Sequence, residues 1–190
     1  MKRIVITGLG AVTPIGNDAA TAFHAAVEGH SGVGPIAFEQ HPDARVRIGA
    51  AVKNFDAAAA IGKKEVHRHA RFTHLAVGAA KQALADSGLR DAGYAPERVG
   101  CILGVGMGGI EVIAQEVAAY DRAGPRKLSP FGIPAAIPNI AACMVAIEAN
   151  AQGPCFSIAS ACASSAHAIG EALESLRRGS TDAVITGGTE

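Results

Sequence analysis

The sequence has no tryptophan, few aromatic residues and no excess of either charge. Aromatic residues make up 4% of the 190-residue chain, whereas hydrophobic residues make up 49% and 23 positions are glycine. A core built from Ala, Val and Ile is typical of closely packed α/β proteins, and this composition argues against a disordered chain. The 17 Lys and Arg residues balance the 17 Asp and Glu residues, so net charge gives no general attraction to a nucleic acid.

Metal-binding cysteine pairs and long uninterrupted apolar runs are also missing. The four cysteines form no C-x-x-C pair, and no group of Cys and His residues has zinc spacing, so we expect no metal site. The start of the chain is too short and too rich in glycine for a signal peptide. Residues 133–151, the most apolar long stretch, contain two prolines and Glu148, unlike a membrane span. We therefore expect a cytoplasmic protein with reduced thiols, no membrane segment and no nucleic acid partner.

Strand-like apolar runs alternate with stretches of helical periodicity along the chain. This alternation predicts an α/β fold with a largely parallel or mixed sheet. Residues 30–60 lack clear periodicity and are expected to form a surface excursion with one short strand at 46–52. The other expected strands are residues 3–12, 99–106, 156–159 and 182–186, with the first placed centrally and 156–159 buried. The expected helices are residues 18–28, 63–87, 110–120, 134–150 and 163–178.

Two of the expected helices have an unusual composition. The helix at 134–150 is so apolar that we expect it to lie in a core or to be covered by a partner subunit. The helix at 63–87 begins with a run of basic residues and continues as an apolar, buried segment. The basic run is either a solvated helix end or a docking patch for an acidic partner. Its members are Lys63, Lys64, His67, Arg68, His69 and Arg71.

Cys162 lies between an expected strand and an expected helix, and small residues flank it. A thiol at a helix N-terminus faces unpaired backbone N–H groups and the positive end of the helix dipole. Both favour the thiolate, which is the nucleophilic form of cysteine. Most free cysteines, however, are buried and structural. The local pattern alone therefore leaves a nucleophile and a structural residue as equal alternatives.

A glycine-rich segment at 104–109 follows the strand expected at 99–106. A loop of this kind between a strand and a helix can bind a nucleotide phosphate. The spacing is not G-x-G-x-x-G, however, and we expect no acidic residue at the end of a second strand, as dinucleotide sites require. The alternative is that these glycines let the backbone approach another part of the molecule closely.

Four segments of the sequence resemble signatures of the β-ketoacyl-acyl-carrier-protein synthases. The segment 153–170, which contains Ser-Ala-Cys-Ala-Ser-Ser around Cys162, is similar to the active-site cysteine motif of that family. The resemblance covers the whole chain and is greatest with the elongating enzymes of type II fatty acid and polyketide systems. It implies a thiolase-like fold of two α/β halves, layered αβαβα, in which residues 1–190 are the N-terminal half and the C-terminal half is absent. The other similar segments are residues 5–16, 124–131 and 187–190.

The resemblance implies a 3-oxoacyl-[acyl-carrier-protein] synthase, an acyltransferase that catalyses decarboxylative Claisen condensation. Cys162 would accept the acyl group as a thioester, and its own backbone N–H would contribute to the oxyanion hole. Malonyl-acyl-carrier-protein would lose carbon dioxide, and the resulting carbanion would attack the thioester. The family's two catalytic His residues and its Lys belong to the absent half, so this half alone is expected to be inactive in condensation. The alternative is a non-catalytic partner resembling a chain-length factor, although such partners have lost the cysteine that this chain keeps.

The resemblance also implies where substrates and partners bind. Met107 would line or gate the acyl pocket, and together with the small Gly132 it predicts space for medium, long or bulky acyl chains. His167 lies five residues after Cys162 on the same helix and is expected to point to a different face, as a structural or interface residue. The implied substrate-binding residues are Met107, Gly108, Gly132, Ile133 and Ala161, and the implied carrier-protein docking residues are Lys64, His67 and Arg68.

The implied partners are proteins rather than cofactors. Acyl carrier protein would bring both substrates on its phosphopantetheine arm, so we expect no separate cofactor. The synthase itself would form a homodimer, or a heterodimer with a chain-length factor.

Overall fold

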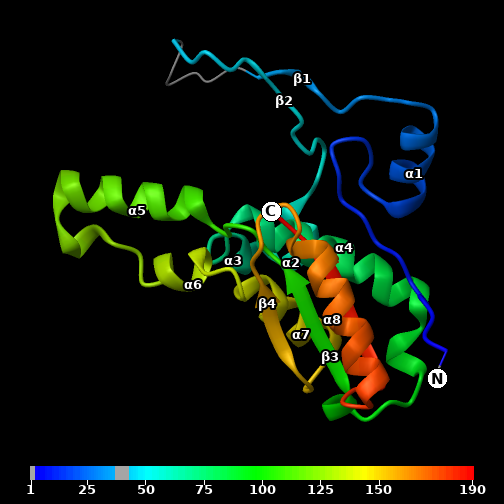
Figure 1. Ribbon diagram of the computed structural model, residues 1–190. Helices are drawn as coiled ribbons and strands as arrows, with labels where there is room; N and C mark the ends of the chain where they lie inside the picture. The colour runs from blue at the N-terminus through cyan, green and yellow to red at the C-terminus, as the bar shows by residue number, and fades with distance from the viewer. Residues whose placement is uncertain (1–2, 37–42) are drawn as a thin grey trace.

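A three-stranded parallel sheet lies at the centre of the computed structural model, which describes residues 3–36 and 43–190 (Figure 1). The strand order is β4 (Cys155–Ile158), β3 (Val99–Gly104) and β5 (Ala183–Gly188). Every residue of β3 is buried, as expected for a central parallel strand that is covered on both faces. The structure therefore confirms the strands predicted at 99–106, 156–159 and 182–186.

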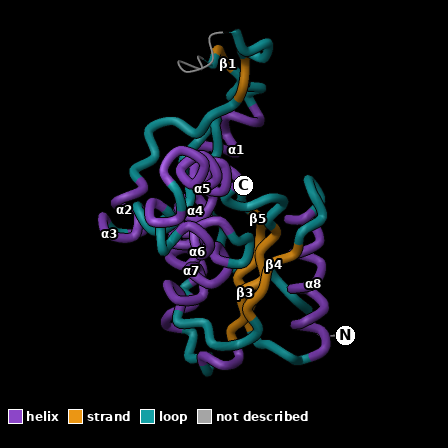
Figure 2. The backbone as a smooth tube through the Cα atoms, turned by 90° about the vertical axis from the view of Figure 1, so that its left-hand side faces the viewer, coloured by secondary structure: helices purple, strands orange, loops and turns teal. Residues whose placement is uncertain are grey.

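Helices cover both faces of the sheet, so the body of the protein has three layers (Figure 2). α4 (Arg71–Ser87) and α7 (Ile140–Ala149) lie against one face, and α8 (Ser164–Arg178) lies against the other. Side chains from α4, α7 and β3, among them Phe72 and Val145, form the larger hydrophobic core. A smaller hydrophobic cluster fills the space between the sheet and α8. This arrangement confirms the predicted α/β class.

Capping residues bound several helices close to where the sequence predicts. The Asp18 side chain accepts a hydrogen bond from the Thr21 N–H at the start of α1 (Ala19–Val27), and Gly88 adopts a left-handed conformation directly after α4. α5 (Ile110–Ala123) confirms another predicted helix. Within residues 3–36 and 43–190, no helix has the length and apolarity needed to cross a membrane. The shorter helices are α2 (Ala57–Ile61), α3 (Lys63–Val66), η1 (Leu89–Asp91), η2 (Pro96–Arg98), η3 (Pro125–Lys127) and α6 (Gly132–Ala136).

Residues 3–12 form no strand, so the prediction of a central strand there is wrong. The segment instead lies along α4, where the Leu9 N–H donates a hydrogen bond to the Asp86 carboxylate at 2.9 Å. Gly10 permits this approach, because a Cβ at that position would overlap the backbone of α4. The Ile6 side chain is 81% exposed. An apolar run broken by glycines has the same composition whether it pairs with a strand or packs on a helix, since both need close backbone approach.

The helix predicted at 63–87 is in fact two helices. Residues 67–70 separate α3 from α4, and Ala70 adopts an extended conformation there. Ala70 is only 3% exposed and packs in the larger hydrophobic core. No glycine or proline marks this break, so the tertiary burial of Ala70, rather than local helix propensity, accounts for it.

The helix predicted at 134–150 is also divided. It begins at Gly132 as α6, stops at Ile137 and resumes as α7. Ile137 has an extended conformation, which is favoured in a residue that precedes a proline, here Pro138. Val145 of α7 is fully buried, so this apolar helix lies in the core, which is one of the two places expected for it.

Two predicted strands differ from the structure in burial or length. β4 was expected to be buried, but its first two residues are exposed, because among the described residues only β3 pairs with it. The strand predicted at 46–52 is reduced to β2 (Ile48–Gly49), which pairs antiparallel with β1 (Gly34–Pro35). Residues 37–42 of the predicted surface excursion lie outside the described residues.

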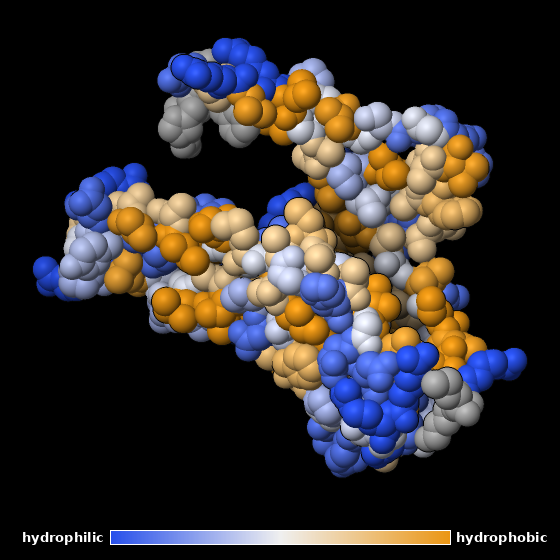
Figure 3. Space-filling view, in the orientation of Figure 1, coloured by the Kyte–Doolittle hydropathy of each residue, from blue (hydrophilic) through white to orange (hydrophobic). Residues whose placement is uncertain are grey.

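α5 and α6 form an arm that projects from the body (Figure 1). No residue of α5 is buried. Val117 of α5 is 64% exposed and Ile133 of α6 is 75% exposed, and Figure 3 shows apolar residues along this arm. An apolar surface of this kind usually marks an interface with another molecule.

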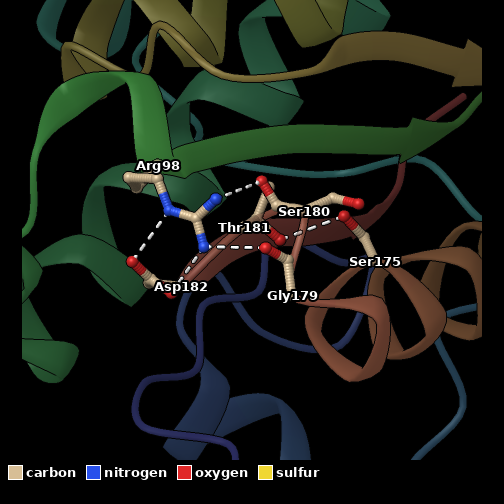
Figure 4. Close-up of polar contacts among 6 residues, drawn as sticks. All are labelled: Arg98, Ser175, Gly179, Ser180, Thr181 and Asp182. Carbon is tan, nitrogen blue, oxygen red and sulfur yellow. Dashed lines mark hydrogen bonds and ion pairs between the residues drawn. The ribbon is translucent and has the colours of Figure 1, made fainter.

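Arg98 joins two segments at the amino end of the sheet (Figure 4). Its guanidinium donates two hydrogen bonds to the Asp182 carboxylate, at 3.0 and 2.9 Å, and one each to the carbonyls of Gly179 and Ser180. The hydrogen bond to Asp182 raises the pKa of Arg98. Because Gly179 and Ser180 directly follow α8, the positive charge also lies at the negative end of that helix dipole.

Candidate active site

The carboxyl ends of the three strands meet on the side of the sheet opposite the Arg98 contacts. Gly104 ends β3, Ile158 ends β4 and Gly188 ends β5. The Val105 N–H donates to the Ile158 carbonyl at 3.0 Å, and the Thr189 N–H donates to the Gly104 carbonyl at 3.1 Å. Ligands of open parallel sheets bind outside the carboxyl ends of the strands, so this is the edge at which to look for a site.

Cys162 stands on a tight turn between β4 and α8. Ala161, the residue before it, has a φ of +50°, a left-handed conformation that residues other than glycine rarely adopt. The Ser164 hydroxyl holds the turn, because it accepts from the Ser160 N–H at 2.8 Å and donates to the Ala161 carbonyl at 2.6 Å. Ser164 is 4% exposed, whereas Cys162 is exposed. The turn therefore presents the thiol on a backbone that internal hydrogen bonds keep in a strained conformation.

α8 starts directly against the end of β3. A Cβ at Gly104 would overlap the backbone of Ser164 and Ser165, so only glycine allows this approach. Cys162 precedes the first residue of α8 by two positions and lies near the positive end of the helix dipole. The Cys162 N–H donates no hydrogen bond to any residue that the structure describes, which leaves it available to a ligand.

His167 contacts Ser160, the residue that begins the turn. Its Nδ1 atom lies 2.7 Å from the hydroxyl oxygen of Ser160. The contact joins the second turn of α8 to the segment that leaves β4, which gives His167 a structural place beside the turn.

The glycine-rich loop after β3 surrounds a carboxylate of the chain itself. The Glu190 side chain accepts hydrogen bonds from the N–H groups of Gly106 at 2.7 Å, Met107 at 3.1 and 3.2 Å, and Gly108 at 3.0 Å. Successive N–H groups that converge in this way form a nest for an anion. A nucleotide phosphate would need the same N–H groups. The loop therefore fits the second interpretation, in which glycines allow close backbone approach.

Glu190 and Ser164 were not predicted as site residues. The strand that follows the glycine loop, β4, has no acidic residue after it, as expected. Glu190 instead stands two residues after the later strand β5. That position was the available signal, since residues just beyond the carboxyl ends of parallel strands usually face the site. For Ser164 the signal was weaker, because a serine among small residues is unremarkable until its burial is known.

Three of the five implied substrate-binding residues come together here. Met107 and Gly108 belong to the loop that binds Glu190, and Ala161 belongs to the cysteine turn. The two segments are neighbours, because a Cβ on Gly106 would lie 3.6 Å from the Ala161 carbonyl oxygen. The Met107 side chain is 63% exposed. The loop and the turn thus form one continuous surface around Cys162.

Gly132 and Ile133 lie on α6, farther from this surface. The last residue of α6, Ala136, accepts a hydrogen bond from the Gly109 N–H at 3.0 Å. Gly132 itself is buried, and a Cβ there would lie 2.9 Å from the Glu116 side chain. α6 therefore contacts the glycine loop through its last residue, Ala136, and not through Gly132 or Ile133.

The implied docking residues Lys64, His67 and Arg68 are exposed on α3 and just after it. The Arg68 guanidinium is not a free charge, since it pairs with the Glu65 carboxylate at 3.0 Å and lies over the Phe131 ring at 5.0 Å from the ring centre. Glu65 therefore reduces the positive potential of the patch, and Arg68 connects α3 to the arm.

Two of the other cysteines, Cys101 and Cys155, have thiols with a raised pKa. Burial raises the pKa of the Cys101 thiol, which is fully buried. Although Cys155 is exposed as a whole residue, partial burial of its thiol together with the neighbouring Cys143 raises its pKa to about 11. Both thiols stay protonated at neutral pH. This difference favours Cys162 as the reactive cysteine over the structural alternative.

Comparison with known proteins identifies the relatives of this chain. The family described as "Beta-ketoacyl synthase, N-terminal domain" matches residues 1–190. The chain is 40% identical over 189 residues to 3-oxoacyl-[acyl-carrier-protein] synthase 2 of Synechocystis sp. and to that of Staphylococcus aureus strain N315. The alignments cover 100% of this chain but 45% and 46% of those proteins. The chain therefore spans about half the length of the curated relatives it matches.

Solved structures of ketosynthases share the fold. A β-ketoacyl synthase from Burkholderia phymatum STM815 matches with a TM-score of 0.81 at 27% identity, over 95% of this chain and 45% of that one. The ishigamide ketosynthase/chain length factor matches with a TM-score of 0.84 at 26% identity, over 98% and 52%. A type II polyketide ketosynthase in complex with its acyl-carrier protein, at 23% identity and a TM-score of 0.83, supports the fold alone, over 99% and 50%. These matches confirm the thiolase-like fold.

Proposed function

The chain belongs to the family of β-ketoacyl synthase N-terminal domains, and we propose that it is the first half of a 3-oxoacyl-[acyl-carrier-protein] synthase with Cys162 as its nucleophile. One observation carries the proposal: an exposed thiol stands on a strained turn at the start of α8, at the carboxyl edge of the sheet. The protein formed by this chain and a second half of the length found in its relatives is called the intact enzyme below.

In the first step Cys162 exchanges thioesters with an acyl carrier protein. The sulfur attacks the acyl carbonyl carbon, a bond forms between carbon and Cys162 Sγ, and the bond to the phosphopantetheine sulfur breaks. The phosphopantetheine thiolate leaves and takes up the proton that Cys162 lost. The α8 dipole favours the attacking thiolate. The Cys162 N–H, which has no acceptor among the described residues, can donate to the oxygen that becomes negative.

In the second step the acyl group is extended by two carbons. Malonyl-acyl-carrier-protein loses carbon dioxide, and the resulting carbanion attacks the Cys162 thioester. The cysteine thiolate leaves, and the 3-oxoacyl product stays on the carrier protein. Groups that promote decarboxylation belong to the second half of the enzyme, so this half alone is expected to be inactive in condensation, and no separate cofactor is required.

The acyl chain would occupy a pocket whose wall includes the glycine loop. Met107 is the residue of that loop with a long side chain, and its unbranched thioether adapts to different substrates. The neighbouring Gly108 and Ala161 are small. Gly132 and the exposed Ile133, the other implied lining residues, lie farther away on α6. This arrangement suits medium to long acyl chains, and Met107→Phe is expected to shorten the products.

Two protein partners follow from the proposal. Lys64, His67 and Arg68 would bind the acidic carrier protein, and reversing the charge of Lys64 and Arg68 is expected to weaken binding most at low salt. The apolar arm of α5 and α6 would be covered by a second subunit. That subunit is a second copy, or a chain-length factor of the kind present in one of the similar solved structures.

Intact-protein mass spectrometry tests the proposal directly. The intact enzyme is incubated with acyl carrier protein thioesters of several chain lengths, alongside Cys162→Ala and the matched control Cys155→Ala. One acyl adduct on the unmodified enzyme and on Cys155→Ala, but none on Cys162→Ala, is the expected result. A folded enzyme that forms no adduct at any chain length would instead indicate a non-catalytic partner like a chain-length factor.

A further inference from the structure

Glu190 binds three successive N–H groups through one carboxylate. Oε2 accepts from Gly106 at 2.7 Å, Oε1 accepts from Gly108 at 3.0 Å, and both oxygens accept from Met107 at 3.1–3.2 Å. Hydrogen bonds to an ionised carboxylate are stronger than those between neutral groups. The end of β5 is therefore fastened to the loop that follows β3, the strand beside it.

Other contacts hold the two ends of the loop, since the Val105 N–H donates to the Ile158 carbonyl and the Gly109 N–H to the Ala136 carbonyl, each at 3.0 Å. Three of the four residues at positions 106–109 are glycine, so no Cβ restricts their backbone. The Met107 side chain is 63% exposed, so packing within the described residues does not determine where it points. The Met107 N–H is therefore held by the carboxylate alone among the described residues.

Neighbouring segments leave room for the carboxylate only because position 106 has no side chain. A Cβ on Gly106 would lie 2.9 Å from Glu190 Oε2 and 3.6 Å from the Ala161 carbonyl oxygen. Gly108 has a φ of +78°, and a Cβ there would lie 2.8 Å from the Ala136 carbonyl oxygen. The carboxylate therefore lies where the Cys162 turn, the end of α6 and the end of β5 meet the loop.

We propose that Glu190 is a positioning residue that holds Met107 at the acyl pocket and thereby sets the preference of the enzyme for acyl chain length. The inference rests on the proposed function, in which Met107 lines that pocket. Glu190 touches neither the substrate nor the Cys162 thiol in this scheme, because it acts through the Met107 backbone. A loop without the carboxylate keeps its glycines but loses the contact that gives Met107 one orientation.

Three variants distinguish a positioning role from a general effect on folding. Glu190→Gln replaces one accepting oxygen by an NH₂ group that cannot accept from the loop. Gly106→Ala displaces the carboxylate from the other side while keeping its charge. Glu190→Asp keeps the charge on a shorter side chain and is expected to restore part of the function. Glu174→Gln is the matched control, because Glu174 is an exposed carboxylate that pairs with Arg177 on α8.

The experiment measures how fast Cys162 of the intact enzyme is acylated by hexanoyl- and tetradecanoyl-acyl-carrier-protein. Glu190→Gln and Gly106→Ala are expected to change the ratio of the two kcat/KM values in the same direction, by about tenfold. Most of that change should appear in KM for the longer chain, and Glu190→Asp should fall between Glu190→Gln and the unmodified enzyme. Glu174→Gln should leave the ratio unchanged. In the folded variants, hydrogen exchange of the amides at 106–108 should be faster after Glu190→Gln.

Two failures have separate meanings. If the unmodified enzyme forms no acyl adduct, the proposed function fails and this inference fails with it. If the enzyme is acylated but Glu190→Gln slows both substrates equally, or Gly106→Ala leaves the ratio unchanged, the proposed function stands and the positioning role is overturned. An unchanged exchange rate at 106–108 would also overturn it.

Discussion

At the amino end of the parallel sheet, the Arg98 guanidinium joins the end of α8 to the start of β5 by four hydrogen bonds. At the carboxyl end, the same strands meet around a left-handed Ala161, an exposed Cys162 thiol and the carboxylate of Glu190. At the amino end the polar groups bind one another, whereas the carboxyl end keeps the strained Ala161 and a Cys162 N–H that has no acceptor among the described residues. Strained and exposed groups persist only where surrounding structure fixes them, and this difference supports the proposal that the carboxyl end carries the chemistry.

One added methyl group on β3 tests the two ends with the largest expected effect. Gly104→Ala places the methyl group in the backbone of Ser164, so we expect the start of α8 to be displaced and the free energy of unfolding to fall by about 3 kcal/mol. Gly100→Ala is the matched variant at the amino end, where the nearest atom, the Pro154 carbonyl oxygen, lies 3.1 Å away. We expect a loss of about 1 kcal/mol there. Equal losses in urea unfolding would show that both ends tolerate a methyl group equally.

Two buried serines of α8 allow a second comparison. Ser164→Ala removes the hydroxyl that binds both the Ser160 N–H and the Ala161 carbonyl. We expect the free energy of unfolding to fall by about 2 kcal/mol. Ser175 lies near the amino end of the sheet. Ser175→Ala removes one hydrogen bond to the Thr181 hydroxyl and should lower the free energy of unfolding by about 1 kcal/mol. The rate at which iodoacetamide alkylates the Cys162 thiol should change in the first variant only. A changed rate in Ser175→Ala would contradict the separation of the two ends.

Removing the guanidinium tests the amino end alone. Arg98→Ala is expected to lower the thermal unfolding midpoint without altering the alkylation rate of Cys162, because all four of its hydrogen bonds lie at the other end of the sheet. Arg98→Lys should have an unfolding midpoint little higher than that of Arg98→Ala, since an ammonium group cannot bind Asp182 in a bidentate manner. Arg177→Ala, which removes an exposed ion pair with Glu174, serves as the control and should have no measurable effect.

The smallest expected effect is a pH dependence near the carboxyl end. His74 is 7% exposed on α4, and its burial lowers its pKa, against backbone hydrogen bonds with His69 and Val66 that act in the opposite direction. Below the ordinary histidine pKa of about 6.5 the unfolded chain takes up a proton that the folded chain binds less readily. Stability should therefore fall as the pH drops below that value. His74→Gln should flatten this dependence between pH 7 and pH 5 in urea unfolding, and an unchanged slope would assign it to other groups.

Local signals were sufficient for much of the fold. β3 and β5 are short apolar runs between turn residues, and α8 has apolar residues at helical spacing, so each was predictable from its own residues. Residues 3–12 were not, because the Ala11 N–H binds the Gln82 side chain, 71 positions away in the sequence. An extended run on a helix and a strand in a sheet differ only in such distant partners.

The same reasoning separates the predicted part of the site from the part that was missed. Cys162 and its turn are local, since a strand, small residues and a helix follow one another directly. Glu190 was missed because its partner Gly106 lies 84 positions earlier, and no local pattern indicates that a glycine loop and a later carboxylate will meet. The break between α3 and α4 was missed for a related reason, because it depends on the burial of Ala70.

The position of β3 in the sheet also has a consequence for synthesis on the ribosome. Its two partners, β4 and β5, both come later in the chain, and β5 begins about 80 residues after β3 ends. At elongation rates of about 5–20 residues per second, the strand waits several seconds for its second neighbour. β3 contains no charged residue. Arg98 lies directly before it, at a position where a charge opposes aggregation of an apolar strand. The residue that joins α8 to β5 in the folded protein therefore also supplies a charge directly beside the strand that waits longest for its partners.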